Sequence, residues 1–189
     1  MAPILGIWAS SRPSVAADTG AMFPLQVITV GPAGASSVEF TNIPNTYSHL
    51  QVRAIARTTA SEADGNSFIV RINGDTGNNY TEHRIIGTGS TIGVGGVANA
   101  TFYGYQVTSS SQLASTFGTF VMDVLDYKDT NKYKTFRGLG GFEDNSVGRI
   151  GFWSSVWMNT NAINAIRILP SGGNWSQYSQ FALYAVKGA

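Results

Sequence analysis

The stretch that decides the fold is the C-terminal third, Gly148–Ala189, which reads GRIGFWSSVWMNTNAINAIRILPSGGNWSQYSQFALYAVKGA. Apolar and polar residues alternate in three parts of it, which predicts strands over Arg149–Trp157, Ala162–Leu169 and Gln180–Val186. The last two are separated by Pro170–Asn174, whose proline and glycines favour a turn. Alternation of this kind, with β-branched and aromatic residues, indicates half-buried antiparallel strands.

The same alternation runs through the chain upstream of this stretch, and no long segment has the 3.6-residue period of a helix. Further strands are expected at Phe23–Val30, Ser37–Phe40, His49–Thr59, Ser67–Asn73, Tyr80–Ile86, Thr101–Val107, Phe117–Tyr127 and Tyr133–Phe142. Gly87–Ala98 is glycine-rich and is the weakest ordered stretch, and Gly138 and Gly140 predict a bulge or tight bend. The pattern predicts an all-β, antiparallel two-sheet sandwich of jelly-roll type, with late strands beside early ones.

The N-terminal residues differ from the rest of the chain. Met1–Ser11 is apolar, and the small, polar Ser10–Gly20 follows it as a linker. We therefore expect an extended arm and linker over residues 1–22 and the β-sandwich domain over residues 23–189. The arm would attach to a neighbouring subunit or a larger particle through Ile4, Leu5, Ile7 and Trp8. The alternative is an N-terminal strand packed on its own domain.

Composition excludes some classes of protein. Charged residues make up 12% of the chain and the formal net charge is +1. Without a run of lysine or arginine, the basic patch of a nucleic-acid-binding protein is missing, so no nucleic-acid partner is expected. No stretch approaches the roughly 18–20 continuous apolar residues of a membrane span, so no membrane insertion is expected.

Catalytic motifs are absent from the sequence, which contains neither a phosphate-binding loop nor a nucleophile elbow. The only histidines are His49 and His83, which we interpret as structural. Asp123 and Glu143 could lie on neighbouring strands as a carboxylate pair for glycoside hydrolysis, but nothing in their spacing singles them out. We expect no enzymatic activity.

Two polar loops offer oxygen ligands of the kind that calcium prefers. One contains Asp75, Asn78 and Asn79, and the other contains Asp126, Asp129 and Asn131. Plain turns use the same residue types. We interpret both loops as turns and expect no metal and no cofactor.

Aromatic residues gather in the C-terminal third beside asparagine and glutamine. The candidate glycan-binding or subunit-interface surface consists of Trp153, Trp157, Trp175 and Tyr178. Aromatic faces next to amides suit sugar binding, because ring faces pack on sugar C–H groups while the amides bind hydroxyls. Packing in the core or at a subunit interface is the other interpretation.

Three segments of the chain resemble the small structural proteins of tailed bacteriophages. They are the start MAPILGIWASS, the loop Asn73–Tyr80 (NGDTGNNY) and the ending Phe181–Ala189 (FALYAVKGA). In that group a short apolar N-terminal peptide precedes a β-rich domain that closes on such a strand. The resemblance implies a virion protein, either a head decoration or fibre protein or a tail fibre or tip protein, with capsid or tail proteins as partners. It also implies a homotrimer, and it brings no catalytic residue.

The sequence therefore predicts a non-enzymatic bacteriophage structural protein located in the virion. Its N-terminal arm would anchor it to the particle and its β-sandwich would project from the particle or self-associate. The alternative function is a carbohydrate-binding, lectin-like module that recognises host-surface glycan during host attachment.

Overall fold

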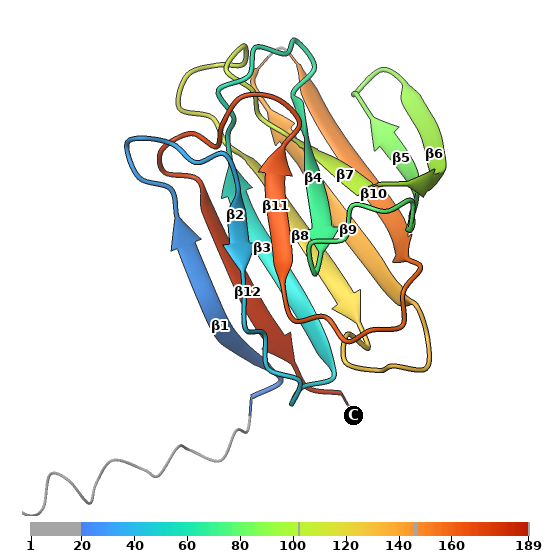
Figure 1. The fold of residues 1–189 in the computed structure, drawn as a ribbon. Coiled ribbons are helices and arrows are strands. Elements are labelled where there is room, and N and C mark those ends of the chain that lie inside the picture. Colours follow the sequence, from blue (N-terminus) through green and yellow to red (C-terminus); the bar gives the residue numbers. More distant parts are fainter. Residues whose placement is uncertain (1–19, 102, 146, 189) are drawn as a thin grey trace, which may run out of the picture.

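A computed structural model describes residues 20–101, 103–145 and 147–188, and these residues form twelve strands and no helix. The strands are β1 (Met22–Thr29), β2 (Val38–Phe40), β3 (His49–Ala56), β4 (Asn66–Ile72), β5 (Tyr80–Gly87), β6 (Ile92–Ala100), β7 (Tyr103–Val107), β8 (Gly118–Leu125), β9 (Lys134–Glu143), β10 (Gly148–Trp157), β11 (Ile166–Pro170) and β12 (Gln180–Val186). They pack as a sandwich of two antiparallel sheets (Figure 1), which confirms the prediction of an all-β, two-sheet sandwich.

The larger sheet has eight strands in the order β1-β12-β3-β8-β9-β10-β5-β6, and the smaller has four in the order β2-β11-β4-β7. Late strands lie beside early ones, as expected. β12 is inserted between β1 and β3, and β11 pairs with both β2 and β4. The C-terminal third therefore contributes to both layers, because β10 and β12 belong to the larger sheet and β11 to the smaller.

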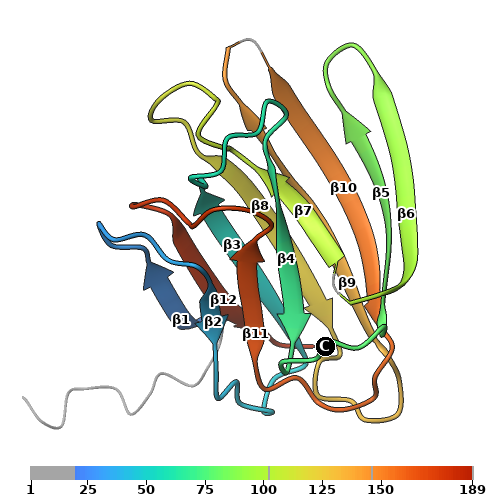
Figure 2. The ribbon, with the colours of Figure 1, turned by 45° about the horizontal axis from the view of Figure 1, so that its top comes forward.

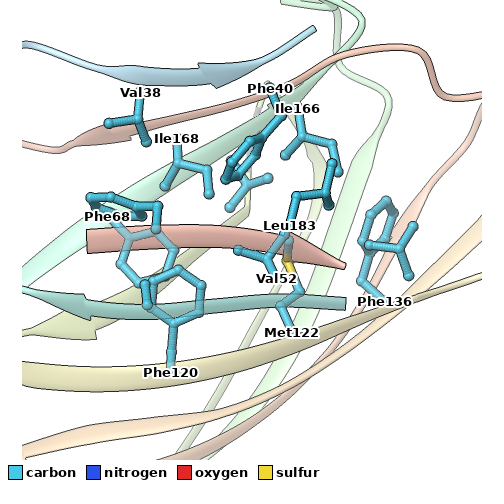
Figure 3. Close-up of a cluster of buried hydrophobic side chains, with 14 of the residues drawn as sticks. Val38, Phe40, Val52, Phe68, Phe120, Met122, Phe136, Ile166, Ile168 and Leu183 are labelled. Atoms are coloured by element: carbon cyan, nitrogen blue, oxygen red, sulfur yellow. The ribbon is translucent and has the colours of Figure 1, made fainter. Parts of the chain in front are cut away.

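The core lies between the two sheets, where alternate residues of each strand point inward. Figure 3 shows side chains from the smaller sheet meeting side chains from the larger one. The labelled residues, all buried, are Val38, Phe40, Phe68, Ile166 and Ile168 from one layer and Val52, Phe120, Met122, Phe136 and Leu183 from the other. Phe68 stacks on Phe120 with ring centroids 4.4 Å apart, so aromatic packing joins the two sheets.

Three sequence-based expectations about strands were wrong. Ile92–Ala100 is a strand, although its glycines hid the alternation. β9 pairs without a register shift on both sides, so Gly138 and Gly140 make no bulge. β11 begins only at Ile166, because Asn164 and Ala165 donate their backbone N–H groups to the side chain of Asn73 instead of joining the sheet.

The larger sheet extends beyond the smaller one on one side. Figure 2 shows β5 and β6 standing at the far end of the larger sheet, past β7. This extension gives the larger sheet a long outer face, which points away from the smaller sheet.

Candidate interaction surface

An apolar band crosses the outer face of the larger sheet. The pairing register places Val121 opposite Leu139 and Leu139 opposite Phe152. The same row continues from Phe152 to Ile85 and from Ile85 to Val94. The row therefore runs across five neighbouring strands, β8, β9, β10, β5 and β6.

The next row of the same face adds two isoleucines, since Ile150 and Ile92 both lie opposite Gly87. The apolar band is defined as Ile85, Ile92, Val94, Val121, Leu139, Ile150 and Phe152, all of which are exposed. Single exposed apolar residues are normal on any protein, whereas contiguous ones mark interaction sites. The arrangement in adjacent rows makes the band a candidate contact surface.

On the side of β3, polar residues adjoin the band next to Val121, while Ile55 of the same strand is also exposed. Arg53 lies opposite Val121, and its Nε donates to Gln51 Oε1 at 2.7 Å. Gln51 Nε2 donates in turn to Asp123 Oδ1 at 2.7 Å, and Asp123 lies opposite Arg137 on β9. An apolar centre with a polar border is the usual anatomy of a protein–protein contact.

Between β8, β9 and β10 the band is hollowed. A shallow depression of about 570 Å³ is lined by Val121, Leu139 and Ile150 together with the small residues Thr119 and Gly141. Because Thr119 and Gly141 lie opposite each other in the register, small side chains form the floor between larger apolar ones. Such a depression can accept a protruding apolar side chain of a partner.

A second, smaller hollow of about 390 Å³ lies on the inner side of the extension, between β10, β5 and β7. Glu82 is buried there, pairs with Arg84 and accepts the backbone N–H of Gly104 at 2.9 Å. Arg149, also in the lining, pairs with Asp64 at 2.8 Å. The charged side chains that line this hollow, Glu82, Arg84 and Arg149, are therefore each engaged in an ion pair.

Of the four aromatic residues predicted to form a glycan-binding or interface surface, three are in the interior. Trp153, Trp157 and Trp175 are buried, and Tyr178 is 70% exposed. Trp175 packs edge-on against Phe181 at 4.9 Å, while the ring of Trp153 lines the inner hollow. The three indole rings are packed in the interior, and only Tyr178 is exposed. The four residues therefore do not form one surface.

The carboxylates considered for hydrolysis do not converge. Asp123 is on β8 and Glu143 on β9, which are neighbouring strands as expected. The register places Asp123 opposite Arg137, six residues from Glu143. At about 3.4 Å per residue this separation is about 20 Å, which is far too great for a pair that flanks one glycosidic bond.

The polar loop after β4 satisfies its own carboxylate. Asp75 accepts hydrogen bonds from Gly77 N, Asn79 Nδ2 and Trp157 Nε1, the last at 2.7 Å. Partial burial alone would raise the pKa of Asp75, but the hydrogen bonds from Trp157, Gly77 and Asn79 outweigh burial and hold the pKa below its ordinary value. Asp75 therefore organises a turn.

The loop after β8 is organised by a lysine. Lys132 Nζ lies 2.6 Å from Asp126 Oδ2 and 3.4 Å from Asp129 Oδ2, so it neutralises both carboxylates. The hydrogen bond to Asp126 is the main cause that raises the pKa of Lys132, and Asp129 adds to it. In the part of the chain that the structure describes, no three histidine, aspartate or glutamate side chains gather as metal ligands.

The predicted arm residues Ile4, Leu5, Ile7 and Trp8 lie outside the described residues. The apolar band itself was not predicted. Its signal in the sequence is apolar residues on both faces of one strand, as in Phe120-Val121-Met122 and Phe152-Trp153. In a strand with one face in solvent, apolar and polar residues alternate. Adjacent apolar residues therefore indicate that the second face of the strand is covered as well.

No protein-family model, curated protein or solved structure matches this chain. Among the described residues, no helix is long and apolar enough to cross a membrane.

Proposed function

We propose that the protein is a non-enzymatic structural subunit that works by associating with further copies of itself and with other proteins of a larger particle. The particle that the sequence resemblance implies is a bacteriophage virion, with the protein as a head decoration, fibre or tail fibre component. The observation that carries the proposal is the apolar band, which crosses five strands of the larger sheet.

Association with a partner stabilises a protein with such an exposed apolar face. Exposed leucine, isoleucine and phenylalanine side chains lose contact with water when a partner covers them, at about 25 cal/mol per Å² of apolar surface. Few charges on the chain oppose such contacts, since only 12% of residues are charged. A subunit whose surface is mostly covered in its assembly needs little charge to stay soluble.

The strand order supports a jelly roll as the architecture of this subunit. β1-β12-β3-β8 faces β2-β11-β4-β7, and the chain passes from one sheet to the other at eight of its eleven connections. In this interpretation β5–β6 and β9–β10 are two inserted hairpins that extend the larger sheet, and most of the apolar band lies on them. The homotrimer implied by the resemblance would then be held through the band, whose residues would meet a neighbouring copy around a three-fold axis.

The proposal that the subunit is not an enzyme is supported by the surroundings of its carboxylates. Glu82 and Asp75 are each bound by several donors, and Asp123 and Glu143 lie far apart along their strands. The glycan-binding alternative has less support, because Tyr178 is the one exposed ring among the four aromatic residues assigned to it. A glycan array separates the two functions, since a structural subunit gives no sugar-dependent binding.

Leu139→Lys tests the proposal by sedimentation velocity. Leu139 is central in the band, so a lysine there has to bury its charge in the contact, and we expect the dissociation constant of the assembly to rise at least tenfold. Val27→Lys is the matched control, because Val27 is 56% exposed on the same face but lies on β1, outside the band. A wild-type protein that is monomeric at about 100 μM, or an equal response of the two variants, contradicts the proposal.

A further inference from the structure

The exposed edges of the two sheets differ in how well they are protected. An edge strand presents unpaired N–H and C=O groups to other chains, and proteins usually blunt such edges with proline, bulges, charges or short strands. β1 carries Pro24 and a register shift between Pro24 and Gln26. β2 has three residues, and β7 has five and lies against the larger sheet.

β6 is protected only at its C-terminal end, where its pairing with β5 has a register shift between Val97 and Ala100, and its segment Ile92–Val97 pairs without a shift. It is nine residues long, reads IGVGGVANA, and contains no charge and no proline. Ile92 and Val94 are 79% and 80% exposed. Among the described residues β6 pairs with β5 alone and forms the end of the larger sheet, where Figure 2 shows it as the outermost strand.

We propose that β6 pairs with β6 of a second copy, antiparallel and around a two-fold axis close to Val94, so that two larger sheets join into one continuous sheet. The inference rests on the proposed function in requiring self-association, but it uses the edge of the sheet rather than the apolar band as a whole. If each subunit makes both a two-fold contact at β6 and a cyclic contact through the apolar band, the angle between the two axes decides whether the assembly is closed or extended.

A second copy is the partner that fits this edge. A two-fold axis places each residue near its own counterpart, so any charge on the strand would meet a like charge, and β6 has none. With the axis at Val94, Val94 lies opposite itself, Ile92 opposite Gly96, and Gly93 opposite Gly95. Ile92, the large side chain next to the axis on this face, then faces a glycine, and two β-branched residues meet at the centre.

The nearest charged side chains leave this contact undisturbed. Arg84 of β5 lies opposite Gly95 and is paired with Glu82. In the joined sheet the two β5 strands are three strand spacings apart, about 14 Å, which exceeds the Debye length of about 8 Å at physiological salt. Repulsion between the two Arg84 side chains is therefore screened.

A single-cysteine experiment tests the proposal, since the natural chain has no cysteine. In full-length Val94→Cys, two opposed cysteines would have Cβ atoms near the distance of about 3.5–4.5 Å that a disulfide requires. We expect mild oxidation to convert the variant to a covalent dimer on a non-reducing gel. Val27→Cys, on the same face at the opposite end of the sheet, is the matched control and stays monomeric on the gel.

The outcomes separate this inference from the proposed function. Crosslinking of Val94→Cys that persists when Leu139→Lys is added supports pairing through the edge. If Val94→Cys crosslinks no faster than Val27→Cys while Leu139→Lys still dissociates the wild-type assembly, the β6 inference is wrong and the proposed function stands. If crosslinking appears only after residues 1–19 are deleted, the arm covers β6 and the inference is equally wrong.

A charge exchange gives a second, independent readout by sedimentation. Val94→Lys and Val94→Glu should each abolish the β6 contact, because like charges meet at the two-fold axis, whereas an equal mixture should restore it as a heterodimer. Two variants that dissociate separately and remain apart when mixed would show that the strand does not pair with itself, and would overturn the inference.

Discussion

At the scale of single residues, Asp75 links the turn after β4 to the core through the indole of Trp157. Its hydrogen bonds keep its pKa low in the folded protein, so its stabilisation is present above the unfolded-state pKa of about 3.9 and is lost as the pH falls through the lower folded-state value. Asp75→Asn should reduce the free energy of unfolding by about 2 kcal/mol at pH 7. Urea unfolding at several pH values checks this, and a difference of the same size at pH 2 would contradict it.

Asn73 directly follows β4 and binds the segment before β11. It has a φ of +51°, donates from Nδ2 to Ala162 O, and accepts at Oδ1 from Asn164 N and Ala165 N. Asn73→Ala should lower the free energy of unfolding by about 3 kcal/mol, because it removes these hydrogen bonds and places a Cβ-bearing residue without them at positive φ. Asn73→Gly should cost about 1 kcal/mol less, since glycine accepts that conformation. Equal losses in chemical denaturation would show that backbone strain plays no part.

At the scale of strands, glycine serves close approach in β9 rather than a bulge. A Cβ at Gly141 would lie 1.9 Å from the carbonyl oxygen of Arg149 on the paired strand β10. Gly141→Ala should therefore force the two strands apart and lower the melting temperature, with a cost of about 2–3 kcal/mol. Gly93→Ala on β6 is the control, because its added Cβ meets nothing closer than 3.9 Å, and it should stay within about 0.5 kcal/mol of wild type.

The same strands show what the sequence could and could not predict. Alternation located β3 and β8 well, since one of their faces is buried and the other is partly or fully exposed. β6 was missed because Gly93, Gly95 and Gly96 remove the side chains that carry the pattern. The apolar band was missed because it depends on register: Leu139 and Phe152 are distant in sequence and meet only through the pairing of β9 with β10.

The tryptophans mark a different limit. Their position among amides suited both a binding surface and a core, and composition could not decide between them. Burial depends on which layer covers each ring. Trp175 is covered because its neighbour Phe181 belongs to β12 and Phe68 belongs to the opposite sheet. That coverage is a property of the assembled sandwich, so it could be read only from the structure.

At the scale of the whole molecule, the described domain supplies its own core. The buried cluster is built from residues between Val30 and Leu183, and β1 begins at Met22. We therefore expect deletion of residues 1–19 to leave the melting temperature within about 2 °C of wild type, a shift that corresponds to at most about 1 kcal/mol for a domain of this size. A cooperative loss of structure on deletion would instead place the arm in the core of its own domain.

The same deletion separates folding from attachment. If Ile4, Leu5, Ile7 and Trp8 dock on a larger particle, the shortened protein should fold but fail to co-purify with particles from the producing host. Ile4→Asp with Trp8→Ala in the full-length chain is the finer variant, because it keeps the length of the arm and removes its apolar contacts. Particles that retain either variant at the wild-type level would show that attachment uses the apolar band or the β6 edge, and the arm would then have no part in assembly.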